Sequence, residues 1–355
     1  MAIMKFGETP IQRGTFLALL AAFAFGATTP FIQKFGTGIG PFPVAALLYA
    51  GAALTSIRWF RSDAPDQPVR RKDIPRLLLV ATFGALIAPV AFAWGVQHTS
   101  ATSASLLLNF EAVATVILAW LLFREPIGGR VIGAVLAMVA GAVVLVVPGG
   151  TSGSGIGWGG VAVAAASTAW ALDNTLAKPL SDLAPTQVVF WKGILGATVS
   201  AVLAFCFHQP FPSHWGALAL LACGAAGYGL SLRLYLLAQR RLGAARTGSI
   251  FAFAPFIGAS VAWALGERSG GMATIVAGAL FLAGVCLHLF EVHAHLHSHE
   301  PLEHEHPHRH DDGHHDHEHD PPVSGEHVHA HVHDGRSHSH PHDLDLHHRH
   351  AHGHG

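Results

Sequence analysis

The sequence predicts an all-α polytopic membrane protein, with ten transmembrane helices in two inverted five-helix repeats and a disordered tail. Three observations lead to this fold class. Hydrophobic residues make up 51% of the 355 and charged residues only 12%, against roughly 25% charged residues in a soluble domain. Apolar stretches that are long enough to cross a bilayer recur through the first 290 residues. Residues 291–355 hold 24 of the 28 histidines.

Each expected span is an apolar stretch of about 20 residues, the helical length that crosses a hydrocarbon layer of roughly 30 Å. The expected limits are 14–34, 41–60, 74–97, 101–123, 129–148, 157–178, 185–207, 214–237, 244–266 and 271–290. Lys5 and Arg13 precede the first stretch, as basic residues precede a secretory signal. That stretch is longer than a signal core, so we expect it to be retained as a helix.

The basic residues predict the orientation, because Lys and Arg in short loops stay on the cytoplasmic side. With the N-terminus inside, the inner connections carry the basic clusters at 58–76 and 240–246, and the outer connections carry only Lys34 and Arg268. We therefore expect a multi-pass protein of the inner or plasma membrane with both termini in the cytoplasm. The basic residues form no single patch, so nucleic-acid binding is not expected.

The first half of the chain is echoed in the second. The segment 101–125 aligns with 244–267 when Ala119-Trp120 is placed on Ala262-Trp263, which sets Glu111 opposite Ala254. Five helices in each half reverse the orientation of the second copy, an arrangement that secondary transporters use around a site at the bilayer midplane. The expected parts are a cytoplasmic N-terminus 1–13, a first repeat 14–148, a Gly/Ser linker 149–156, a second repeat 157–290 and the tail 291–355.

These repeats resemble the EamA type of the drug/metabolite transporter superfamily. In that family the fourth and ninth helices end in a pattern similar to LEPVFTALLAWLLLGE. The first copy here runs from Phe110-Glu111-Ala112 to Glu125, and the second from Phe253-Ala254-Pro255 to Glu267. Ala112 replaces the usual proline, and Ala254 stands where a second acidic residue can occur. The resemblance covers about residues 14–290 and implies a permease that exports a small solute by alternating access.

Ionisable side chains inside a bilayer are costly and are therefore candidates for function. Glu111 lies near the middle of its span, and we expect it to bind a cationic group or a proton; the alternative is a structural hydrogen bond. Asn109, two residues earlier, lies on another side of the helix and serves either the site or packing. Asp173 and Lys192 form either a gate or zwitterion site, or an ion pair that fixes helix packing.

Three further residues complete the candidate site for substrate or coupling. Lys178 lies near the inner end of the sixth span, and Trp94 and Trp170 lie within the third and sixth. The tryptophans either line a cavity or anchor the helices, which is the commoner role of aromatic residues in spans. No catalytic motif occurs, so an enzyme is not expected, and no cofactor is required.

The tail offers imidazole at every second residue in several stretches. Neutral imidazole binds zinc, nickel and cobalt well, so we expect divalent-metal binding there. The candidate ligands are His293, His295, His297, His299, His304, His306, His308, His310, His327, His329, His331 and His333. With almost no large apolar residues, the tail is expected to be disordered.

The tail leaves several functions open. It either senses or donates metal for the transporter, or it buffers metal without any link to the cargo, or it senses pH, since imidazole titrates near pH 6.5. The main alternative to solute export is a divalent-metal transporter, and an alternative of another class is a membrane-anchored metal store. The expected partners are a small-molecule substrate and lipid, and the oligomeric state is a monomer or a homodimer.

Overall fold

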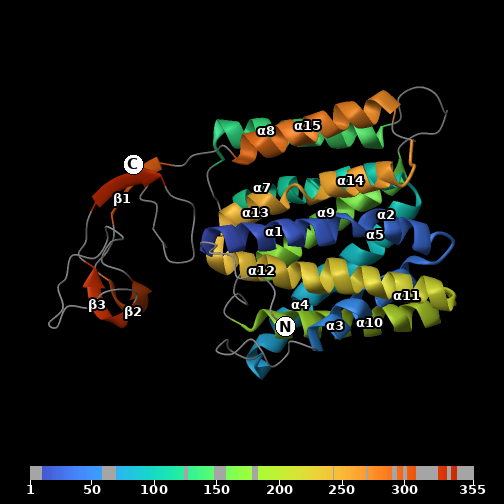
Figure 1. Ribbon diagram of the computed structural model, residues 1–355, viewed down its shortest axis with the longest axis horizontal. Coiled ribbons are helices and arrows are strands. Elements are labelled where there is room, and N and C mark those ends of the chain that lie inside the picture. The colour runs from blue at the N-terminus through green and yellow to red at the C-terminus, as the bar shows by residue number, and fades with distance from the viewer. Residues whose placement is uncertain are drawn as a thin grey trace. The chain divides into compact units, whose positions relative to one another are not determined.

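The computed structural model describes the helical part at residues 10–57, 69–123, 127–147, 157–177, 183–242, 244–268 and 271–289, and four strands beyond it. The contacts divide the chain into two units, Met1–Glu291 and Val292–Gly355, and each unit is described by itself. Figure 1 shows the first unit as a bundle of helices that run side by side along one common direction.

The helices of the first half begin and end as follows. They are α1 (Pro10–Gly26), α2 (Thr28–Gly36), α3 (Pro41–Ile57), the 3-10 helix η1 (Arg71–Asp73), α4 (Ile74–Ala81), the π-helix η2 (Thr82–Ile87), α5 (Ala88–Gln97), α6 (Ala101–Leu107), α7 (Phe110–Phe123) and α8 (Gly129–Val146).

The second half repeats this arrangement. Its helices are α9 (Trp158–Ala177), α10 (Pro185–Cys206), α11 (His214–Cys223), the π-helix η4 (Gly224–Leu230), α12 (Ser231–Leu242), α13 (Ala244–Phe251), α14 (Ala254–Ala264) and α15 (Gly271–Leu289).

Within the described residues, eight helical segments are long and apolar enough to cross a membrane. They are Ile11–Gly36, Arg71–Gln97, Ala101–Leu122, Gly129–Val146, Thr186–Cys206, His214–Leu242, Arg246–Ala264 and Gly271–His288. Two other expected spans are occupied by α3, a shorter apolar helix, and by α9, which has 20 residues and is not among the eight. The multi-pass helical fold is therefore confirmed, whereas the count of ten spans stays a prediction.

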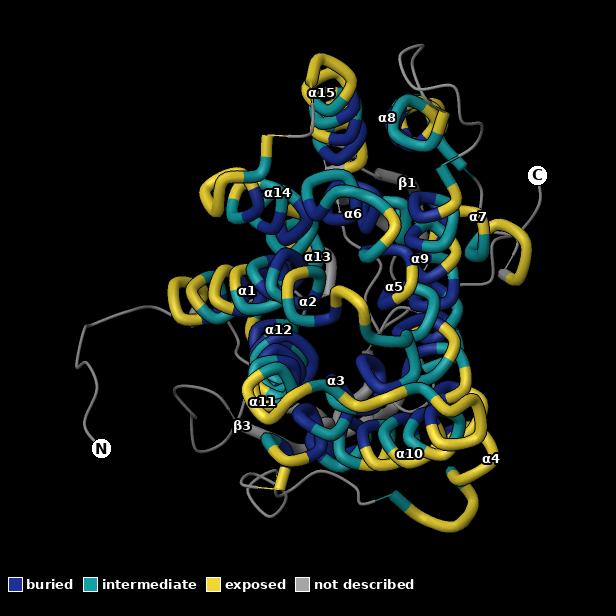
Figure 2. Tube along the Cα trace, turned by 90° about the vertical axis from the view of Figure 1, so that its right-hand side faces the viewer, coloured by how far each residue is buried: buried dark blue, intermediate teal, exposed yellow. Residues whose placement is uncertain are grey.

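The outer surface of the bundle is apolar. Figure 2 shows most of the buried residues toward the middle of the bundle and many of the exposed ones along its outer side. Among the exposed residues are many large apolar side chains, such as Phe205, Trp215 and Ile275. A soluble protein rarely shows such continuous apolar surface, whereas lipid tails cover it at no cost. The bundle is thus built for a hydrocarbon solvent.

The packing of the helices follows a pseudo-twofold relation between the halves. When the spans of the first half are mapped onto those of the second in order, α3 corresponds to α10 and α8 to α15. The contact of α3 with α10 and that of α8 with α15 therefore each map onto themselves, and both are among the most extensive contacts. The same relation maps the packing of α1 against α12 onto the packing of α9 against α5, and both are again extensive. The expected two repeats are therefore present in the packing.

Irregular helical segments recur at equivalent places in the two halves. The third span of each half contains a π-helix, η2 in the first and η4 in the second. The fourth span of each half is interrupted, at Leu108–Asn109 between α6 and α7, and at Ala252–Phe253 between α13 and α14. Such π-segments and interruptions concentrate at functional sites, because they leave carbonyl groups free to accept other bonds.

Among its described residues, the second unit contains four strands where the sequence predicts disorder. Strand β1 (Ala294–Ser298) pairs with β4 (Ser337–Pro341), and β2 (Leu302–His308) pairs with β3 (His327–His333), both antiparallel. The prediction considered only that the tail lacks apolar side chains to bury. The alternation of histidine with other residues also has the two-residue period of a strand, which explains the difference over these segments.

Candidate functional site

An ion pair lies inside the second repeat. The Lys192 ammonium on α10 donates to both carboxylate oxygens of Asp173 on α9, at 2.8 and 2.6 Å. The side chains are only 12% and 6% exposed. A buried ion pair offsets its own desolvation only with good geometry and further hydrogen bonds, and removing one partner leaves a costly isolated charge. The structure thus brings together two of the residues that the sequence singled out.

The carbonyl oxygen of Gly84 is a second polar centre, next to this pair. It belongs to the π-helix η2 and accepts hydrogen bonds from the Tyr49 hydroxyl and from the Trp170 indole Nε1, the latter at 3.1 Å. A methyl group at Gly84 would collide with the Asp173 carboxylate, so the backbone of η2 lies directly against the ion pair. Donors from α3 and α9 therefore converge on one carbonyl of the first repeat.

Glu111 makes a polar contact between the two repeats. Its Oε1 accepts a hydrogen bond of 2.7 Å from Asn174 Nδ2 on α9, directly after Asp173. Glu111 is half-buried and Asn174 is exposed. Glu111 lies in the first turn of α7, where the positive end of the helix dipole stabilises a carboxylate. One turn of α9 thus carries two polar residues, one paired within its own repeat and one with the other repeat.

Asn109 is buried in the interruption between α6 and α7. Its Nδ2 donates to the Leu106 carbonyl at 3.1 Å. Around it the backbone bonds span three residues, with Glu111 N donating to Leu108 O and Ala112 N donating to Asn109 O, both at 3.1 Å. Asn109 therefore contacts the backbone of the interrupted helix, and through it sets where the first turn of α7 begins.

An aromatic cluster lies beside the polar residues and draws on both repeats. Phe25 on α1 contacts the rings of Trp170, Tyr228 and Phe251, with centroids 6.5, 5.8 and 5.6 Å apart. Tyr49 packs against Tyr228 at 5.6 Å. Edge and tilted ring contacts of this kind each add about 0.5–1.5 kcal/mol beyond area burial. The centre of the bundle therefore combines charged, amide and aromatic groups, which suits a small solute with polar and flat apolar parts.

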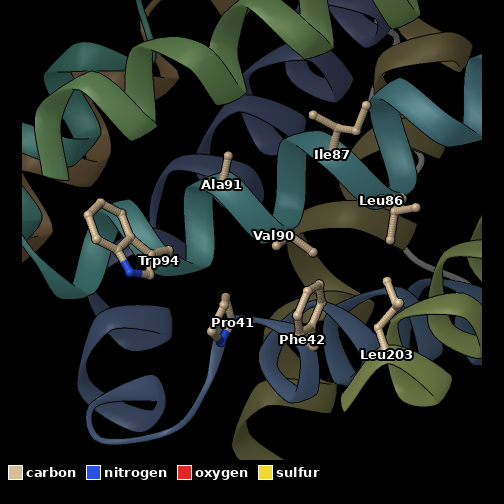
Figure 3. A pocket seen from close by; sticks show the side chains of 8 residues that line it. All are labelled: Pro41, Phe42, Leu86, Ile87, Val90, Ala91, Trp94 and Leu203. Atoms are coloured by element: carbon tan, nitrogen blue, oxygen red, sulfur yellow. The ribbon is translucent and has the colours of Figure 1, made fainter. Parts of the chain in front are cut away.

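Trp94 lies apart from this centre. It lines an apolar pocket of about 500 Å³ between α3, α5 and α10, with Phe42, Val90 and Leu203 among the other lining residues. Figure 3 shows Trp94 at one end of this pocket, with only apolar side chains along it. Its ring also stacks on His98 at 4.1 Å. The structure thus places Trp94 with apolar neighbours and not with Asp173 or Glu111.

Some of the predicted site residues lie outside the described residues. These are Lys178, His293, His299 and His310. The other candidate histidines lie on the strands of the second unit. Among the residues whose side chains are described, no group of three or more His, Cys, Asp or Glu could hold a metal ion.

Sequence reasoning missed Tyr49, Asn174 and the Gly84 carbonyl. A signal for Tyr49 existed, because the chain has only three tyrosines and all three lie inside expected spans. The structure joins all three through ring contacts, since Tyr235 packs on Phe251 at 5.1 Å, beside Phe25 and Tyr228. The Gly84 carbonyl had no signal, because a π-helix leaves no mark in hydropathy.

The sequence matches a known family of membrane proteins in both repeats. A model described as the EamA-like transporter family matches residues 12–147 and again 157–290, so both repeats are recognised separately. A curated relative described as an uncharacterized transporter, from Methanothermobacter thermautotrophicus, is 28% identical over 233 residues. That alignment covers 63% of this chain and 67% of the relative.

A solved structure shares the fold. It is titled only as the crystal structure of a protein, is 19% identical in sequence, and superposes with a TM-score of 0.59. The match covers 77% of this chain and 97% of the other. This similarity concerns the fold alone.

Proposed function

This chain belongs to the EamA-like transporter family and is a membrane permease of the drug/metabolite class; on that premise we propose that it exports a small solute by alternating access around the centre just described. The solute binds between the repeats, at the turn of α9 that carries Asp173 and Asn174. The direction is the one that the family resemblance implies. Both termini lie in the cytoplasm, as the distribution of basic residues favours.

The observation that carries this proposal is the hydrogen bond between Glu111 and Asn174. It joins α7 of the first repeat, directly after the helix interruption, to α9 of the second repeat. Rocking of one repeat against the other has to stretch or break contacts of this kind. The bond is not sealed in the core, because Glu111 is half-buried and Asn174 is exposed. A solute with a cationic group can therefore compete with Asn174 for the carboxylate.

The ion pair of Asp173 and Lys192 supplies the second half of the proposed site. A solute carrying one charge of each sign can bind between the two side chains, with its cationic group on Asp173 and its anionic group on Lys192. No unpaired charge is then left in the membrane. The Trp170 indole, fixed by its bond to Gly84, then offers a flat surface to the solute. This arrangement favours a zwitterionic or amphipathic small molecule over a bare metal ion as cargo.

Export assays on two variants test the proposal. Glu111→Gln keeps the shape and removes the charge, and Lys192→Met leaves Asp173 without its partner. We expect each to lower solute export by at least about tenfold, corresponding to about 1.4 kcal/mol. The measurement compares the metabolites released by cells that express each form at equal membrane abundance, and the thermal unfolding of the purified proteins verifies folding.

The matched control is Trp94→Leu, at the apolar pocket. We expect it to export normally, because Trp94 has no contact with the polar centre. Normal export by folded Glu111→Gln and Lys192→Met proteins would rule out this site. Loss of export in all three variants alike would point to general damage to the bundle and not to a binding site.

A further inference from the structure

The strands of the second unit place histidines opposite histidines. In the β2–β3 ribbon, positions 304, 306 and 308 pair with 331, 329 and 327. In the β1–β4 ribbon, 295 and 297 pair with 340 and 338. Alternate positions along a strand share one face, so each ribbon gathers its histidine pairs on a single face.

This register is a specific choice. In each strand the histidines alternate with other residues, here called spacers. A slip of one residue would set every histidine opposite a spacer, and it would move the histidines of one strand to the other face. Both ribbons avoid that slip. The opposite face of β2–β3 pairs Glu303 with Val332, Glu305 with Ala330 and Pro307 with Val328. Histidines and spacers are thus separated between the two faces.

We propose that the histidine face of the β2–β3 ribbon is a binding site for a divalent transition-metal ion such as zinc. Directly opposed positions in an antiparallel pair have Cβ atoms about 5 Å apart, and alternate positions on one strand are roughly 6.5–7 Å apart. Neighbouring histidine pairs therefore outline a set of four imidazole donors, the number that a tetrahedral zinc ion takes, with Zn–N bonds of about 2.0–2.1 Å. Imidazole nitrogen favours zinc, nickel or cobalt over calcium or magnesium, which prefer oxygen ligands.

The β1–β4 ribbon offers a second, smaller face of the same kind, with two histidine pairs in place of three. The inference therefore predicts one tighter class of sites on β2–β3 and a further one on β1–β4. Ion binding also bridges the strands of each ribbon and so stabilises their pairing, because a metal site couples binding to folding. The site concerns the second unit alone and stands whether or not the bundle carries the proposed solute.

Exchanging neighbouring histidine and valine residues on β3 keeps the composition of the tail. It therefore distinguishes binding at this face from binding that depends only on the number of histidines. The test variant combines Val328→His with His329→Val, and His331→Val with Val332→His. It keeps every histidine in the chain and removes two from the shared face. The control makes an equal number of exchanges between the strands, Asp316→His with His317→Asp, and His319→Asp with Asp320→His.

Binding is measured on the full-length protein, purified through a tag that contains no histidine, by calorimetric titration with Zn²⁺ and by the visible absorption of bound Co²⁺. We expect the exchange on β3 to weaken the tightest Zn²⁺ class by about tenfold or more and to alter the Co²⁺ spectrum. The control should bind within about twofold of the unchanged protein. Equal affinity of the β3 variant and the unchanged protein, or an equal loss in the control, would overturn the proposal in favour of binding by composition alone.

Discussion

Gly84 is the residue at which backbone and site chemistry meet. Its carbonyl holds two side-chain donors, and its α-carbon lies against the Asp173 carboxylate. Gly227 is its equivalent in the second repeat, at the same spacing that separates Ala119 from Ala262. There a methyl group would press on Thr28, the first residue of α2. The two π-helices thus need glycine for the same reason, which is close approach to the first span of the other half, at α9 for Gly84 and at α2 for Gly227.

Gly84→Ala should therefore disturb both the ion pair and the packing. The added methyl group has to displace the Asp173 carboxylate, whose two oxygens both accept hydrogen bonds from the Lys192 ammonium. Overpacking of this kind costs about 1–3 kcal/mol, so we expect a lower unfolding temperature of the purified protein and a marked loss of export. Thermal unfolding in detergent and the export assay measure the two effects separately.

Gly133→Ala is the matched control, in the middle of the regular helix α8. A methyl group there meets only Leu287, at an ordinary 3.8 Å. Alanine is the better helix former by up to about 1 kcal/mol, so the variant should be neutral or slightly more stable. If Gly84→Ala behaved in the same way, the close approach of η2 to Asp173 would have no energetic weight.

The charged residues of the centre could be predicted from the sequence, including an ion pair of Asp173 with Lys192 as one of two alternatives, whereas the neutral partners could not. Glu111, Asp173 and Lys192 stand out because a charge in an apolar span is costly and rare. Asn174 and Tyr49 are neutral and carry no such signal. That Asn174 reaches Glu111 depends on the rotation of α9 between its neighbours, which is a property of tertiary packing.

At the scale of the element, the interrupted fourth and ninth spans reach one geometry by two routes. In α14, Pro255 follows the interruption and explains it, because proline has no N–H and cannot continue the preceding helix. In α7 the equivalent residue is Ala112. There the buried Asn109 amide contacts the Leu106 carbonyl and stabilises the interruption, since short polar side chains compete for backbone bonds in this way.

Asn109→Ala should therefore let α6 and α7 approach one regular helix and move Glu111 away from Asn174. We expect a loss of about 1 kcal/mol in the free energy of unfolding and a drop in export. Adding Ala112→Pro to the same protein supplies the interruption by the other route, so it should restore a large part of the export. The measurement is the export rate of the single and double variants at matched abundance.

The single variant Ala112→Pro serves as the control. Proline removes the bond from Ala112 N to Asn109 O, but the interruption already exists and Pro255 holds the equivalent place in the second repeat, so this variant should export normally. Failure of the proline to rescue Asn109→Ala would mean that Asn109 acts on the solute itself and not through the shape of the helix. That result would move Asn109 from a positioning residue into the binding site.

The helices were predictable from the sequence to within a few residues at most ends, because hydropathy and length determine which segments can cross a bilayer. The interruptions and π-helices were not. A π-helix adds one residue without changing composition, and a hydropathy window averages over it. The sequence predicted Glu111 at mid-span, whereas the structure shows that it opens a new helix, which changes its electrostatic surroundings.

At the scale of the whole molecule, the bundle and the tail are separate units with different chemistry. The bundle has its own core, which includes Phe92, Leu107 and Phe281. A chain that ends after residue 291 should therefore unfold at the same temperature as the full chain and should export solute at the same rate in metal-free medium. In the full chain, added Zn²⁺ should raise the resistance of the tail to proteolysis.

Fluorescent or enzymatic reporters fused before residue 1 and after residue 355 examine the proposed topology. Reporters that are active only in the cytoplasm should be active at both ends, because an even number of spans returns the chain to its starting side. Activity at one end alone would require an odd number of spans, and α3 and α9, the two expected spans that are not among the eight long apolar segments, would be the first helices to re-examine.

The matching positions of η2 and η4 also say something about descent. Each half carries a helix with one extra residue in the same turn of its third span, and a π-helix of this kind arises when a residue is inserted into a regular helix. Two separate insertions at corresponding places are a less economical history than one insertion followed by gene duplication. We infer from this that the bulge was present before a five-helix unit was duplicated.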